Sequence, residues 1–116
     1  MTPVHALATA SYAAIGAVAF ARPSMVPEIF GGSAPTADSR NEIRAVYGGL
    51  TFAIAAVGLA SPAAVGVLSA GMASGRAASA LVEPGSGPVT KVFVGVELAL
   101  AGAYFLAARS RSRRVG

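Results

Sequence analysis

The sequence predicts an all-α integral membrane protein, a bundle of four transmembrane helices. Of its 116 residues, 54% are hydrophobic and only 12% are charged, whereas soluble domains carry about 25% charged residues. The chain also divides into four apolar runs, each close to the ~20 residues that a helix needs to cross the hydrocarbon core of a bilayer. An exterior with so few polar groups must face lipid, so the lipid bilayer is the first expected partner.

Breaks in the apolar pattern set the helix boundaries. The four helices are expected at about 3–21, 39–60, 62–82 and 89–109, in a single domain that covers 1–116. The segment 22–38 contains three prolines and a Gly-Gly pair, which predict a loop, here resting on the membrane surface. Glu42 follows Ser39 by three residues, the spacing of a capping box at a helix start. Ser61-Pro62 separates the second helix from the third, because proline is tolerated in a first helical turn.

The first run is free of charged side chains and ends in small residues. A secretory signal peptide would look similar at its end. However, no Lys or Arg precedes the apolar stretch, and the stretch is long for such a peptide. We therefore expect a retained helix.

The distribution of positive charge predicts orientation and excludes one class of partner. The net charge is +4, and four of the nine basic residues fall in the last eight positions: Arg109, Arg111, Arg113 and Arg114. A basic tail at 110–116, directly after an apolar helix, is typical of the cytoplasmic side. Four spans then place the N-terminus there too, in a multi-pass protein of the inner (plasma) membrane. The chain has no Trp, and its few aromatic residues lie within apolar runs, so no nucleic-acid partner is expected.

The chain has no cysteine and one histidine, His5. Disulfides, thiolate metal sites and multi-histidine metal sites are therefore excluded. No nucleophile–base pair or phosphate-binding loop appears either. We assign no catalytic residue, metal or cofactor, and an enzyme is the least favoured class of function.

Small residues recur every fourth position in the predicted helices, a pattern that lets helices approach closely in lipid. The segment GMASG contains a literal GxxxG. The candidate helix-packing positions are Gly48, Gly49, Gly71, Gly75 and Gly95. Because alanine is abundant, composition alone is an alternative explanation. The pattern also leaves open whether these positions join helices of one chain, two copies in a homo-oligomer, or another membrane protein.

Ionisable groups inside membrane spans are costly, so each is a candidate for a functional site. A rise of ~1.5 Å per residue places Glu97 roughly 12 Å and Arg76 about 10 Å below the outer surface. Opposite charges at matching depth predict an ion pair. The full candidate cluster, in the outer half of the bundle, is Glu42, Arg44, Tyr47, Arg76, Ser79 and Glu97. It is either structural, with charges that neutralise one another, or a polar pocket that binds a small molecule, a lipid headgroup or a proton.

Three segments carry a resemblance to a known family: NEIRAVYGGL (Asn41–Leu50), GRAASA (Gly75–Ala80) and VELALAGAY (Val96–Tyr104). With these, the chain resembles a family of small bacterial four-helix membrane proteins catalogued as a domain of unknown function. The most specific part is E-x-R-A-x-Y-G-G in the second helix. The resemblance implies a four-helix membrane fold over nearly the whole chain, and it implies no activity, substrate or cofactor.

Two functions are carried forward. The first is an accessory or small-ligand- or lipid-binding membrane protein. The alternative is a small proton-coupled or drug transporter that acts as a homo-oligomer. Small multidrug transporters are similar in length and helix number, but they place a glutamate in the first helix, and the run 3–21 contains no acid.

Overall fold

The computed structural model describes residues 1–115. Its helices are α1 (Pro3–Ala21), α2 (Met25–Ile29), α3 (Ala37–Ile43), the π-helix η1 (Arg44–Gly49), α4 (Leu50–Ala60), α5 (Pro62–Val82) and α6 (Pro88–Val115). The described residues contain no strand. Because α3, η1 and α4 are continuous, four helical segments are long and apolar enough to cross a membrane. The all-helical prediction is thus confirmed, whereas the orientation of the termini stays a prediction.

The helix ends agree with the expected bounds except at two places. The second span starts at Ala37, and its capping box is made by Thr36 and Ser39, so the expected capping role of Glu42 was wrong. The last helix continues to Val115 instead of ending near position 109. Arginine is a good helix former, and positive charge is favourable at a helix C-terminus, so the basic tail extends the helix.

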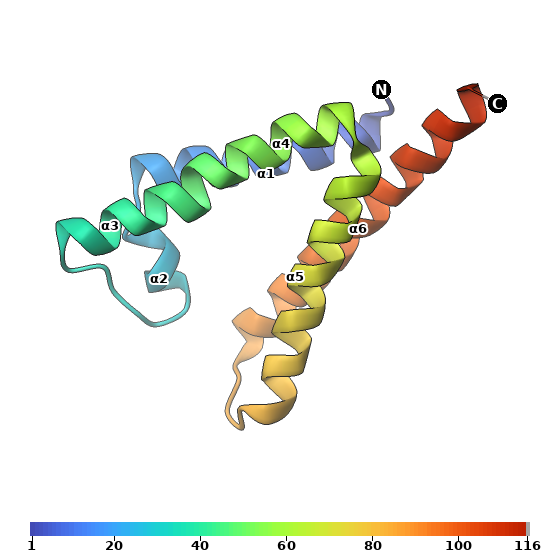
Figure 1. The fold of residues 1–116 in the computed structure, drawn as a ribbon. Coiled ribbons are helices and arrows are strands. Elements are labelled where there is room, and N and C mark those ends of the chain that lie inside the picture. Colours follow the sequence, from blue (N-terminus) through green and yellow to red (C-terminus); the bar gives the residue numbers. More distant parts are fainter. Residues whose placement is uncertain (116) are drawn as a thin grey trace.

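The four long segments form two antiparallel pairs (Figure 1). α1 lies along η1 and α4, and α5 lies along α6. The pairs meet at the end that holds both termini and the turn at Ser61, called the termini end here. They diverge toward the loop end, which holds α2 and the turn 83–87. The bundle is therefore more open than expected, with close packing found mainly within each pair.

The core lies where the pairs meet. Tyr104 of α6 is completely buried there, its hydroxyl is hydrogen-bonded to that of Thr9 at 2.9 Å, and its ring meets the His5 ring edge-on. The buried cluster consists of Ala8, Tyr12, Ala55, Val65, Leu100 and Tyr104. Small alanines around two tyrosines make a thin core, in which each tyrosine fills space between helices.

Basic side chains hold the last turn of α4 at this end. His5 Nε2 donates to the Gly58 carbonyl at 2.7 Å. Arg111 donates from Nη1 to the carbonyl of Ala60 and from Nη2 to that of Leu59, at 2.7 and 2.8 Å. The final carbonyls of a helix lack partners within the helix. His5 supplies one partner from within the same pair, and Arg111 of α6 supplies two and thereby links the two pairs.

Candidate functional site

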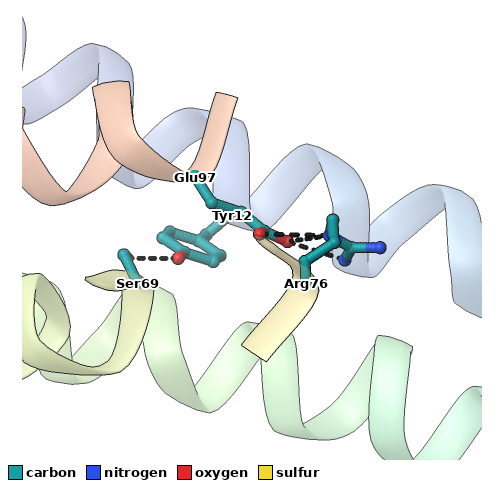
Figure 2. Close-up of polar contacts among 4 residues, drawn as sticks. All are labelled: Tyr12, Ser69, Arg76 and Glu97. Carbon is teal, nitrogen blue, oxygen red and sulfur yellow. Dashed lines mark hydrogen bonds and ion pairs between the residues drawn. The ribbon is translucent and has the colours of Figure 1, made fainter. Parts of the chain in front are cut away.

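The predicted ion pair is present between α5 and α6. Arg76 Nε lies 3.1 Å from both carboxylate oxygens of Glu97, and Nη2 lies 2.7 Å from Oε1 (Figure 2). The Glu97 side chain is 7% exposed and that of Arg76 is 29% exposed. The short turn 83–87 folds α6 back along α5, which brings the two side chains to the same level. The carboxylate is thus enclosed, and only the arginine reaches the surface.

Glu97 occupies one edge of the guanidinium. A guanidinium has five N–H donors in a planar fork. Glu97 accepts hydrogen bonds from the N–H of Nε and from one N–H of Nη2. Arg76 Nη1 has no hydrogen bond within residues 1–115, and it points away from Glu97 in Figure 2. The second edge, formed by Nη1 and the remaining hydrogen of Nη2, is therefore free to donate to another acceptor.

Two phenylalanines cover the guanidinium. The rings of Phe30 and Phe93 lie 5.5 and 5.4 Å from Arg76 Cζ, and their centroids are 5.3 Å apart. Phe30 follows α2 and Phe93 belongs to α6, so α2 reaches from the α1 side across to the α5–α6 pair. Both contacts are within cation–π range. Phe30 could not be identified from the sequence, because a loop residue has no periodicity that would indicate its partner.

A second polar contact lies deeper on α5. The hydroxyls of Tyr12 and Ser69 are hydrogen-bonded between α1 and α5 (Figure 2), and both residues are buried. Ser69 is seven residues before Arg76, so the two share one face of the helix. This face of α5 therefore carries a hydrogen bond to α1 at one level and an ion pair to α6 two turns further on.

The other four members of the predicted cluster do not join the pair. Arg44 Nε donates to the Phe20 carbonyl at 3.0 Å, and its guanidinium lies 5.9 Å from the Phe20 ring. Arg44 thus supplies a hydrogen-bond donor to a carbonyl in the last turn of α1. Glu42, Tyr47 and Ser79 are exposed. Within residues 1–115, no hydrogen bond or ion pair connects any of the four to Arg76 or Glu97. For Glu42, Arg44 and Tyr47 the cause is the divergence of the helix pairs, because α3 and η1 belong to the pair that does not contain Arg76 and Glu97. Ser79 lies on α5 with Arg76, but its side chain is exposed. A ligand-binding role for these residues stays a prediction.

The segment with the most specific resemblance, RAVYGG, is the π-helix η1. π-helical turns are rare and frequently occur at functional sites. Here the turn brings Gly48 against α1. A Cβ atom at Gly48 would lie 3.2 Å from Phe20 Cδ2, and one at Gly16 would lie 3.1 Å from the Gly48 carbonyl oxygen. These two glycines let α1 and η1 approach closely.

The other glycines named from the sequence lie elsewhere. Gly71, Gly75 and Gly95 are exposed, and a Cβ atom there would meet nothing within 4 Å. Gly49 meets only the Arg44 carbonyl oxygen, at 3.8 Å. Besides Gly16, two further glycines that were not selected from the sequence make close contacts within the chain, Gly58 against Tyr104 and Gly66 against Phe105. A packing role for Gly71, Gly75 and Gly95 stays a prediction about contacts with another chain.

Comparison with known proteins adds a family but no activity. A family model described as "Domain of unknown function (DUF4345)" matches residues 3–108. No curated protein and no solved structure matches the chain. Within residues 1–115, no three His, Cys, Asp or Glu side chains gather closely enough to hold a metal ion. The family match confirms the resemblance noted in the sequence.

Proposed function

The chain belongs to the DUF4345 family, and from this premise we propose that it is a small ligand-binding membrane protein whose site is the Arg76–Glu97 pair. The ligand is a lipid-soluble molecule with a neutral oxygen acceptor, such as an ester, amide or quinone carbonyl. The observation that supports this proposal is the free edge of the Arg76 guanidinium beside an enclosed, fully paired carboxylate.

The charge of the site favours a neutral headgroup. Arg76 and Glu97 together carry no net charge, so an additional anion would be left without a counter-charge in a medium of low dielectric constant. A carbonyl oxygen instead accepts hydrogen bonds from Nη1 and Nη2 without bringing charge into the membrane. Hydrogen bonds from a charged donor contribute roughly 1.5–3 kcal/mol, which is enough to select such an acceptor over a plain alkane.

The position of the site also suits a ligand from the bilayer. Arg76 lies six residues before the end of α5 at Val82, which corresponds to roughly 9 Å of helix. Because α5 is about as long as the hydrocarbon core of a bilayer is thick, this depth corresponds to the acyl chains, from which a lipid-soluble ligand can approach the guanidinium. Phe30 and Phe93 give the polar group an apolar border, as is common in ligand sites with few polar groups.

The substitution Arg76→Lys tests the proposal. A lysine keeps the positive charge beside Glu97 but lacks the planar second edge. We expect wild-type protein in detergent to gain thermal stability when monolaurin (an ester-bearing amphiphile) is added, and to gain none from dodecane. The R76K variant should fold and lose most of the monolaurin response.

Arg22→Lys is the matched control. Arg22 is an exposed arginine toward the loop end, and its side chain makes no hydrogen bond within the described residues. R22K should respond to monolaurin like the wild type. A full response in R76K, or equal responses to monolaurin and dodecane, would exclude the guanidinium as the ligand-binding group.

A small proton-coupled or drug transporter acting as a homo-oligomer is the second candidate. Its support is Glu97, an acid enclosed within a helix long enough to span a membrane. Such a protein would have to release Glu97 from Arg76 during each cycle. If the protein is such a transporter, proteoliposomes that contain it should take up protons, and Glu97→Gln should abolish this uptake. Proteoliposomes that remain proton-tight with wild-type protein would exclude it.

We further propose that the protein lies in the inner (plasma) membrane with both termini in the cytoplasm. The support is the group of arginines at the end of α6, since positive charge is retained on the cytoplasmic side. An epitope tag after residue 116 should be inaccessible to antibody in intact spheroplasts and accessible after permeabilisation. Labelling of intact spheroplasts would reverse the orientation.

A further inference from the structure

The termini end carries positive charge that no acidic side chain of residues 1–115 compensates. The last turns of α6, which lie at this end, contain Arg109, Arg111, Arg113 and Arg114. The five acidic residues of the chain all lie elsewhere, at Glu28, Asp38, Glu42, Glu83 and Glu97. Within residues 1–115, none of these four arginines forms an ion pair. This end therefore presents a positive field to any anion nearby.

A surface hollow of about 290 Å³ lies at this end, between the start of α1 and the last turns of α6. Its polar lining consists of Thr2, His5, Ser110, Arg111 and Arg114. Leu59 and Ala107 form an apolar part of the lining. The hollow therefore combines donor groups and an apolar wall at the place where the apolar part of α6 ends.

The arginines of α6 divide into two faces. Ala107, Ser110, Arg111 and Arg114 follow the i, i+3, i+4, i+7 spacing of one helix face, and all four line the hollow. Arg109 and Arg113 do not line it. Arg111 is held in place by the carbonyls of α4, whereas Arg114 is exposed and makes no hydrogen bond within the described residues.

We propose that this hollow binds the phosphate group of an anionic phospholipid. Arginine is well matched to phosphate, because its fork donates two parallel hydrogen bonds to two oxygens. Arg111 is already oriented, Arg114 is free to close over the anion, and the Ser110 hydroxyl is an additional donor. Basic pockets between transmembrane helices bind lipid headgroups in this way. The apolar lining at Leu59 and Ala107 favours a lipid over a free phosphate ion, since it can contact the first carbons of the acyl chains.

Titration of the detergent-solubilised protein with phosphatidylglycerol, followed by native mass spectrometry, tests this site. Arg114→Gln should lower the affinity for phosphatidylglycerol about fivefold, the effect of one basic contact near the membrane surface. Arg113→Gln is the matched control, because it removes the same charge from the same helix on the face away from the hollow. R113Q should retain nearly the wild-type affinity, and phosphatidylcholine should bind all three proteins weakly.

Three outcomes would overturn the proposal. Equal losses in R113Q and R114Q would mean that general charge, and not the hollow, attracts the lipid. Complete displacement of the lipid by millimolar inorganic phosphate would identify a soluble anion as the ligand. A loss of phosphatidylglycerol binding in R76K would place the lipid at the loop end. Because R76K should leave this binding unchanged, the present proposal and that for Arg76 can fail separately.

Discussion

The ring of Tyr104 on α6 fills the space above Gly58 on α4. A Cβ atom at Gly58 would lie 2.7 Å from the Tyr104 hydroxyl oxygen and 2.8 Å from Cε1. Tyr104 is completely buried, and its hydroxyl is hydrogen-bonded to Thr9, so the ring has little room to move. A missing side chain on α4 thus allows the two helix pairs to meet at the termini end.

Gly58→Ala should therefore destabilise the protein. The added methyl group forces Tyr104 to shift inside a filled core, and overpacking of this kind costs typically about 1–3 kcal/mol. The measurement is the free energy of unfolding in mixed detergent micelles. Gly71→Ala is the control, because a Cβ atom there meets nothing within 4 Å. It should leave the free energy of unfolding equal or slightly higher, since alanine is the better helix former. Equal losses in both variants would contradict the close contact at Gly58.

The bounds of α1 and α5 could be predicted from the sequence, but the sides on which the helices contact one another could not. α1 and α5 occur at the expected positions, 3–21 and 62–82, because the length of an apolar run is a local property. In a membrane helix, however, the side that faces lipid is as apolar as the side that faces another helix. The GxxxG pattern therefore selected Gly71 and Gly75, whereas the structure uses Gly58 and Gly66 for contacts within the chain.

The Arg76–Glu97 pair should show strong coupling between its two members. Glu97→Gln or Arg76→Gln alone leaves one charge without its partner, and breaking a buried ion pair costs about 3–5 kcal/mol. We expect losses near the lower limit, because the Arg76 side chain is 29% exposed. The double variant R76Q/E97Q removes both charges, so its loss in the free energy of unfolding should be smaller than the sum of the two single losses.

Unfolding of the wild type, the two single variants and the double variant in one detergent completes this cycle. Additive losses would mean that the two side chains do not stabilise each other. If the double variant recovers stability and also loses the response to monolaurin, then the pair serves both the fold and the proposed site.

The depth argument predicted this pair for a clear reason. α5 and α6 are neighbours joined by a short turn, so residues at similar distances from the turn lie at the same level. Glu42, Arg44 and Tyr47 were placed with the pair on the same ground, but within residues 1–115 they form no hydrogen bond or ion pair with Arg76 or Glu97. Depth contains no information about the direction in which a side chain points, or about how far two helix pairs diverge. The contact of Phe30 with Arg76 was out of reach for a related reason, because it depends on the path of the loop around α2.

Tyr12 and Ser69 provide a test of the contact between the helix pairs. Tyr12→Phe should leave the Ser69 hydroxyl, which is completely buried, without its partner on α1. An unsatisfied buried hydroxyl costs about 1–3 kcal/mol, whereas removal of both partners is closer to neutral. We therefore expect the double variant Y12F/S69A to be at least as stable as Y12F alone.

Ser74→Ala is the control, because the Ser74 hydroxyl is exposed and bonds only to the Ala70 carbonyl of its own helix. Thermal unfolding in one detergent compares Y12F, Y12F/S69A and S74A with S69A and the wild type. If S69A were no less stable than S74A, the hydrogen bond between α1 and α5 would contribute nothing, and the pairs would be held together by side-chain packing, the Thr9–Tyr104 hydrogen bond and the contacts of Arg111 with α4.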